Sequence, residues 1–228
     1  MCGRYSITQT SANLRIEFGF KNALDFRPRY NLAPFQLAPV VRLDDTGSRS
    51  LDMLWWGFEA VSCDEAVARQ PLINARLETV SEKVSFKDAF VKRRCLVLAD
   101  GFYEWKHQNG IKRPYRISNR TEKPFAFAGL WSVGSRYDRG STICASYVIL
   151  TTKASPSISH IHPRMPVILE EKDYQIWLAL DNEDILDHLT TYEDTKLKHY
   201  EVSPRVGNLK NDSADLFKPF TPPQLSLL

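Results

Sequence analysis

Short strand-like runs, most of them bounded by glycine, proline or aspartate, are the feature of this sequence that most restricts its fold. They lie at residues 37–43, 51–58, 95–99, 102–106, 114–118, 125–131 and 143–151. Helical patterns are fewer and lie at residues 11–18, 85–92, 172–179 and 183–189. Because the two patterns do not alternate regularly, the sequence predicts an α+β fold. Its mainly antiparallel sheet should be curled or barrel-like, with a few flanking helices.

A single domain is expected. The chain has 228 residues, of which 43% are hydrophobic and 25% charged, and no repeat or linker divides it. This ordinary globular composition excludes a disordered or collagen-like chain. Three prolines within residues 25–39 favour an extended loop there. The proline-containing tail after Phe217 is expected to be loose.

The sequence predicts no membrane span and no cofactor. No apolar stretch approaches the roughly 18 residues of a span, and the N-terminus does not resemble a secretory signal, so a cytoplasmic location is expected. The cysteines at positions 2, 63, 95 and 144 show neither a Cys-x-x-Cys pair nor a matching histidine spacing. A metal site is therefore not expected, and the thiols should be free.

Positive charge gathers in the first half of the chain. Residues 1–120 hold 19 Lys+Arg against 13 Asp+Glu, whereas residues 121–228 hold 11 against 14. This surplus suits a polyanion such as nucleic acid, although a mixed solvated surface gives the same count. P-loop, dinucleotide-binding and serine-hydrolase motifs are absent from the sequence.

Cys2 is the most informative candidate for chemistry. Removal of the initiator Met1 would leave a thiol and a free α-amine on one residue, and both groups titrate near neutral pH. The amine can condense with an aldehyde to an imine, after which the sulfur closes a five-membered thiazolidine on the same carbon. The alternative is a chain that happens to begin Met-Cys.

Two segments offer groups for proton transfer. Strand alternation places Phe102, Glu104 and Lys106 on one face. A carboxyl group flanked by aromatic residues is partly desolvated, which raises its pKa, although an exposed glutamate paired with Lys106 fits the same pattern. A loop at residues 159–166 holds His160 and His162, of which one is a candidate acid/base and either is compatible with an ordinary loop histidine.

Trp55 and Trp56 are candidates for stacking on bases. Adjacent strand residues point to opposite faces, so both indoles cannot enter one core layer unless apolar layers cover both faces. Arg76 and a basic cluster lie near them in the sequence and suit a groove that follows a phosphate backbone, although such clusters are commonly solvated faces. The cluster consists of Lys83, Lys87, Lys92, Arg93 and Arg94.

Taken in order, several motifs resemble those of the SRAP family, the SOS-response-associated peptidases or abasic-site processing proteins. They span residues 2 to about 206 and are found at residues 2–5, 30–34, 56–57, 73–79, 94–97, 99–105, 128–131 and 161–166. The resemblance implies an SRAP-like domain at 2–206 with a C-terminal extension at 207–228. It also implies a lyase-like sensor that crosslinks abasic sites in single-stranded DNA through a thiazolidine, with no obligatory protein partner.

The resemblance also assigns residues. Those expected in catalysis are Cys2, Asn74, Glu104 and His162. Those expected to bind DNA are Arg4, Asn31, Trp55, Trp56, Arg76 and Arg164. The chain departs from the family where Trp55 replaces a usual arginine, which removes one phosphate contact. Two other functions remain open: a thiol peptidase or amidohydrolase with Cys2 as nucleophile, and a non-covalent single-strand binder.

Overall fold

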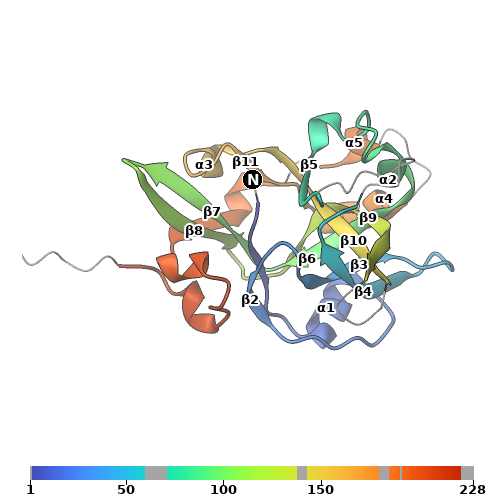
Figure 1. Ribbon diagram of the computed structural model, residues 1–228, viewed down its shortest axis with the longest axis horizontal. Coiled ribbons are helices and arrows are strands. Elements are labelled where there is room, and N and C mark those ends of the chain that lie inside the picture. Colours follow the sequence, from blue (N-terminus) through green and yellow to red (C-terminus); the bar gives the residue numbers. More distant parts are fainter. Residues whose placement is uncertain (1, 60–70, 138–142, 180–184, 191, 222–228) are drawn as a thin grey trace, which may run out of the picture.

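Two β-sheets form the framework of the protein, seen in a computed structural model that describes residues 2–59, 71–137, 143–179, 185–190 and 192–221 (Figure 1). The larger sheet is closed on itself. Its barrel strands are β3 (Leu37–Leu43), β4 (Arg49–Trp56), β6 (Arg94–Ala99), β9 (Phe125–Tyr137) and β10 (Ile143–Lys153). Neighbouring strands pair antiparallel in the order β4, β3, β6, β9. Strand β10 then closes the ring, antiparallel to β9 and parallel to β4.

Three short strands extend the barrel at its edges. β5 (Asn74–Arg76) pairs parallel with β10, and β11 (Arg164–Pro166) pairs antiparallel with β10. β12 (Ile168–Leu169) pairs with β9. Strand β10 is therefore a partner of β4, β5, β9 and β11.

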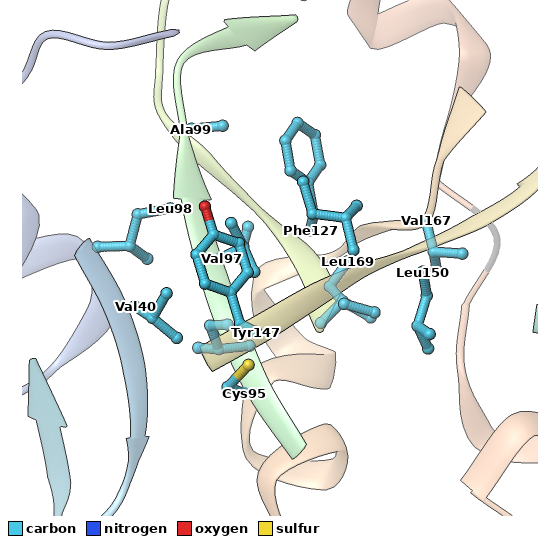
Figure 2. Packing of buried hydrophobic residues seen from close by; sticks show 14 of the residues in the cluster. Val40, Cys95, Val97, Leu98, Ala99, Phe127, Tyr147, Leu150, Val167 and Leu169 are labelled. Atoms are coloured by element: carbon cyan, nitrogen blue, oxygen red, sulfur yellow. The ribbon is translucent and has the colours of Figure 1, made fainter. Parts of the chain in front are cut away.

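The barrel encloses the main hydrophobic core (Figure 2). Every residue of β6 is buried, Val97 lies opposite the buried Phe127 of β9, and Tyr147 of β10 is also fully buried. Close packing of β9 on β6 requires a glycine at position 129. A Cβ there would lie 2.7 Å from Val97 Cγ2 and 2.9 Å from Cys95 Sγ.

The second sheet is antiparallel and has the strand order β13, β8, β7, β1, β2. Its strands are β1 (Tyr5–Ile7), β2 (Arg29–Leu32), β7 (Gly101–Gln108), β8 (Ile111–Asn119) and β13 (Leu197–Glu201). Asn109 and Gly110, with φ of 52° and 75°, form the turn between β7 and β8. An Asn-Gly pair with positive φ at both residues is the preferred two-residue hairpin turn. This hairpin extends away from the barrel (Figure 1).

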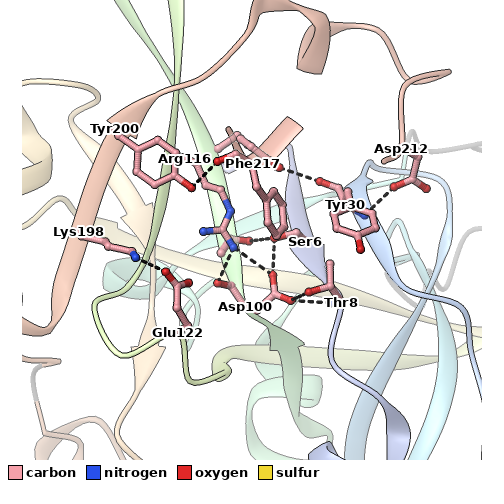
Figure 3. Close-up of polar contacts among 12 residues, drawn as sticks. Ser6, Thr8, Tyr30, Asp100, Arg116, Glu122, Lys198, Tyr200, Asp212 and Phe217 are labelled. Carbon is pink, nitrogen blue, oxygen red and sulfur yellow. Dashed lines mark hydrogen bonds and ion pairs between the residues drawn. The ribbon is translucent and has the colours of Figure 1, made fainter. Parts of the chain in front are cut away.

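Asp100 lies where the chain passes from β6 in the barrel to β7 in the second sheet. Its carboxylate accepts hydrogen bonds from Ser6 Oγ at 2.5 Å and from the backbone N–H and Oγ1 of Thr8 at 2.5 and 2.6 Å. The buried Arg116 guanidinium donates to Asp100 O at 3.1 Å and lies 3.8 Å from the ring centre of Phe217 (Figure 3). This network ties the two sheets and the C-terminal segment together.

Helices are short and lie outside the sheets. The α-helices are α1 (Ser11–Phe18), α2 (Lys87–Lys92), α3 (Pro156–Ser159), α4 (Tyr174–Leu178) and α5 (Ile185–His188). The 3-10 helices are η1 (Leu77–Thr79), η2 (Glu171–Asp173), η3 (Asp194–Lys196), η4 (Pro204–Gly207) and η5 (Ala214–Phe217). Helix α1 begins after the Thr10 cap and ends at Gly19, whose φ is 67°. Within the described ranges, no helix has both the length and the apolar character to cross a membrane.

The α+β fold and its barrel-like core are confirmed, and two local expectations are corrected. Residues 29–32, expected in a loop, form β2, because the prolines at 28 and 34 lie just outside the paired residues. The chain after Phe217 is not loose up to Thr221: Val202 bridges to Pro219, and Phe220 N donates to Glu201 O at 2.9 Å. The rest of the expected tail lies outside the described residues.

Candidate active site

A cleft of about 390 Å³ opens where the β7–β8 hairpin meets the start of β1 and the loop before β11. Arg4, Glu104 and His162 are among its lining residues. Trp105, His107, Lys112 and Gly207 complete the lining. The cleft therefore joins residues from four distant parts of the sequence, and two of the predicted catalytic residues lie in it.

Cys2 lies beside this cleft and is fully buried. The backbone carbonyl of Cys2 accepts a hydrogen bond of 2.8 Å from Asn74 Nδ2. Burial raises the pKa of the Cys2 thiol well above its usual range, and the nearby Glu104 carboxylate raises it further. The thiol is therefore protonated at neutral pH.

Asn74 is placed next to Cys2 by the parallel pairing of β5 with β10, in which Asn74 lies opposite Ile149. The Asn74 Nδ2 donates its hydrogen bond to the Cys2 carbonyl. The Asn74 Oδ1 is buried and accepts no hydrogen bond from the residues described. A buried acceptor of this kind is costly unless another group supplies a donor. Asn74 thus offers a hydrogen-bond acceptor beside Cys2.

Glu104 and His162 are neighbours in the cleft lining. The Glu104 side chain is 4% exposed, and burial raises the pKa of Glu104 from 4.5 to about 7. His162 Nδ1 lies 3.8 Å from Glu104 Oε1, 2.9 Å from Arg164 O and 3.1 Å from Arg164 N. Burial lowers the pKa of His162, so this imidazole is neutral at pH 7. The pair combines a half-protonated acid with a neutral base.

Arg76 and Arg164 lie on opposite sides of β10. Arg76 is exposed and pairs in register with Thr151, while Arg164 pairs with Lys153. The Arg164 guanidinium binds both oxygens of Glu78, at 2.6 and 2.9 Å, and donates to Thr151 O at 2.5 Å. Glu78 therefore offsets part of the positive charge that these two arginines present.

Arg4 and Asn31 connect the cleft to the C-terminal segment. Arg4 Nη1 donates to Asn31 Oδ1 and to Val206 O, both at 2.9 Å. Asn31 is fully buried, and its Nδ2 donates to Val206 O, Asn208 O and Asn211 O at 3.1, 3.2 and 2.7 Å. Arg4 thus lines the cleft, and its expected contact with DNA stays a prediction. Asn31, expected to bind DNA within the site, does not line the cleft and instead anchors the segment that carries Gly207.

The two tryptophans differ in accessibility. Trp56 is fully buried against Tyr5 and Tyr147, and its Nε1 donates to Ile73 O at 2.9 Å. Because the Trp56 ring is not accessible, the expectation that it stacks on a base is wrong. Trp55 is only partly buried, on the opposite face of β4 and beside the position of Phe35, which is 49% exposed. Base stacking stays a prediction for Trp55.

The basic cluster is also smaller than its sequence suggests. Arg94 is buried, with Nη1 donating to Phe90 O at 3.1 Å and its guanidinium over Trp177. Lys92 and Arg93 both pair with Asp88, at 3.0 and 2.5 Å. His160 packs against His199, with ring centres 5.0 Å apart, and does not belong to the cleft lining.

Sequence reasoning missed His107 and Lys112, and also Gly207 and Trp105, as cleft residues. The signal for the first two was present, because Asn109-Gly110 predicts a hairpin in which residues 107 and 112 face each other. Gly207 carried no local signal. In the described part of the chain, no group of three or more His, Cys, Asp or Glu side chains is arranged to hold a metal ion.

Comparison with known proteins gives a consistent picture. The family model described as SOS response associated peptidase (SRAP) matches residues 1–209. Abasic site processing protein YoqW of Bacillus subtilis is 33% identical over 225 residues, covering 96% of this chain and 99% of that protein. Abasic site processing protein YedK of Escherichia coli is 27% identical over 230 residues, covering 96% and 100%. A crystal structure of a protein from Bacteroides thetaiotaomicron has the same fold, with a TM-score of 0.83 at 22% identity over 96% and 100% of the two chains.

The raised pKa of Glu104 predicts a pH-dependent contribution to stability. Because the folded protein holds this proton more tightly than the unfolded chain, the contribution is fully present below pH 4.5 and is lost as pH rises to about 7. The free energy of unfolding of the wild type, minus that of Glu104→Gln, should fall by on the order of 2 to 3 kcal/mol across this window. Urea unfolding at pH 4.5 to 8 measures it, and a difference that stays constant with pH would contradict the burial argument.

Proposed function

This chain belongs to the SRAP family, and from that membership and the geometry of the cleft we propose that it processes abasic sites in single-stranded DNA by a covalent crosslink through Cys2. The observation that carries the proposal is the grouping of four residues. Asn74 binds the Cys2 carbonyl, Glu104 adds to the raised thiol pKa of Cys2, and His162 lies 3.8 Å from Glu104. Relatives named abasic site processing proteins support the same substrate.

The proposed reaction needs the α-amine of Cys2, which removal of Met1 releases. An abasic deoxyribose is mostly a closed hemiacetal, so its ring must first open to the aldehyde. The amine then attacks the C1′ aldehyde carbon, and one water leaves to give an imine. The sulfur adds to the same carbon while the thiol proton passes to nitrogen, which closes the thiazolidine. Overall, aldehyde and aminothiol give a thiazolidine and one water.

The charge state of the site favours an order for these steps. Because burial keeps the Cys2 thiol protonated, the amine acts first and the thiol second. With a pKa of about 7, Glu104 can give a proton during ring opening and imine formation and can later carry the thiol proton to the nitrogen. His162, neutral at pH 7, serves proton transfer at the ring oxygen and in the reverse reaction.

The arginines supply the phosphate contacts in this proposal. Arg76 is exposed at the end of β5, and Arg164 is held in place by Glu78 and Thr151. Each neutralised phosphate of a single strand contributes about 0.7 to the slope of log affinity against log salt. Binding by this route is independent of base sequence.

We expect a DNA-protein adduct that survives denaturation when the mature protein meets a single strand with an abasic site. Cys2→Ala lacks the sulfur that closes the ring, so its adduct should stop at the imine and need borohydride to persist. Denaturing gels with and without borohydride measure this. A stable adduct of Cys2→Ala without reduction would contradict the thiazolidine. Peptide cleavage without any adduct would favour the thiol peptidase, and tight binding without an adduct would favour the non-covalent binder.

Glu104 and His162 should affect different steps. Glu104→Gln removes the titrating proton and should slow adduct formation by roughly 10²-fold, the usual size of general acid–base catalysis. His162→Ala should slow reversal at least as much as formation. Transfer of the protein from a labelled to an unlabelled abasic strand measures reversal. Affinity for a non-reactive strand is the control, and a parallel loss of affinity and crosslinking in both variants would make these residues binding or structural groups.

A further inference from the structure

The β7–β8 hairpin presents two pairs of basic residues on its opposite faces. His107 lies opposite Lys112, and Lys106 lies opposite Arg113. Successive residues of a strand point to opposite sides, so His107 and Lys112 share one face of the hairpin, while Lys106 and Arg113 share the other face with Glu104. The first pair lines the cleft that contains Glu104 and His162, whereas the second pair is absent from the described lining.

Lys112 is available for a ligand. Its side chain is exposed, and within the described residues no carboxylate lies at ion-pair distance from it. Arg113, its neighbour on the other face, differs because it lies 3.7 Å from Glu201 Oε2. In the same cleft lining, the Arg4 guanidinium adds a second positive charge, fixed by its hydrogen bonds to Asn31 and Val206. The cleft lining therefore holds two cationic side chains, Arg4 and Lys112.

Glu104, His107 and Lys112 line one cleft, and the spacing between Glu104 and His107 fits a neighbouring nucleotide. A strand rises about 3.3 Å per residue, so His107 lies about 10 Å along β7 from Glu104. A phosphate held there belongs to a nucleotide next to the reacting sugar, and the reacting sugar itself stays beside Glu104. Lysine suits this role because its flexible ammonium acts as a point charge toward a phosphodiester.

We propose that Lys112 and His107 form a subsite for the phosphodiester backbone on one side of the abasic nucleotide. This proposal rests on the proposed function, since it assumes that a single DNA strand enters the cleft. The hairpin would then act as an arm that guides the strand toward Glu104 and His162. Lys112 supplies the charge, and His107 supplies a ring N–H donor next to it.

The test measures the affinity for single-stranded DNA that carries a tetrahydrofuran analogue of the abasic site, which has no aldehyde and cannot crosslink. We expect Lys112→Ala to weaken binding about 3- to 10-fold and to reduce the salt slope by about 0.7, the value for one phosphate contact. Lys106→Ala, on the other face of the same hairpin, should change neither quantity. Fluorescence anisotropy at several salt concentrations provides both numbers.

Truncated strands locate the contact. One strand lacks every nucleotide on the 5′ side of the analogue, and a second strand lacks every nucleotide on the 3′ side. The loss of affinity caused by Lys112→Ala should vanish with at least one of these strands. The proposal is overturned if the effect survives on both truncated strands, if Lys106→Ala reproduces it, or if Lys112→Ala binds like the wild type. Crosslinking of the wild type to a true abasic strand is scored separately. Its failure would refute the proposed reaction, whereas intact crosslinking with an unchanged salt slope for Lys112→Ala would refute the subsite alone.

Discussion

The pairing of β10 with four other strands is the constraint on which the rest of the structure depends. Pairing with β4 and β9 closes the barrel. On one edge, β5 pairs with residues 149–151 of β10 and brings in Asn74 and Arg76. On the other edge, β11 pairs with residues 151–153 and fixes Arg164, two residues after His162. A shift of one residue in this register would turn these side chains to the other face, so the candidate site depends on the closed barrel.

Desolvation sets the chemistry of the site more than any single charge does. It is the largest cause of the raised pKa of Cys2 and Glu104 and of the lowered pKa of His162. Each of these groups is held in a state that water would not favour, and the buried Oδ1 of Asn74 adds a further cost. Proteins concentrate such unfavourable groups where they serve a reaction. The Asp100 carboxylate, by contrast, accepts hydrogen bonds from Ser6 and Thr8 at both of its oxygens and stabilises the junction between the sheets (Figure 3).

Local patterns predicted most of the strands, because apolar runs and turn residues are read from neighbouring positions. The parallel pairing of β10 with β4 and β5 had no local signal, since it joins residues far apart in the chain. The same holds for the site. The burial of Trp56 and Arg94 and the anchoring role of Asn31 follow from long-range packing, whereas their residue types suggested contact with DNA. The match in motifs identified Cys2, Asn74, Glu104 and His162 as a group, and spacing along the chain alone does not bring them together.

The central claim is that both the nitrogen and the sulfur of Cys2 bind one carbon of the abasic sugar. Alkylation of the denatured, unreduced adduct with iodoacetamide, followed by mass spectrometry of its peptides, tests this claim directly. The account predicts that Cys95 is alkylated while Cys2 is protected, and that the N-terminal peptide gains the mass of the sugar fragment less one water. A crosslinked N-terminal peptide whose Cys2 sulfur is alkylated would contradict it, because the sulfur would then be free of the sugar.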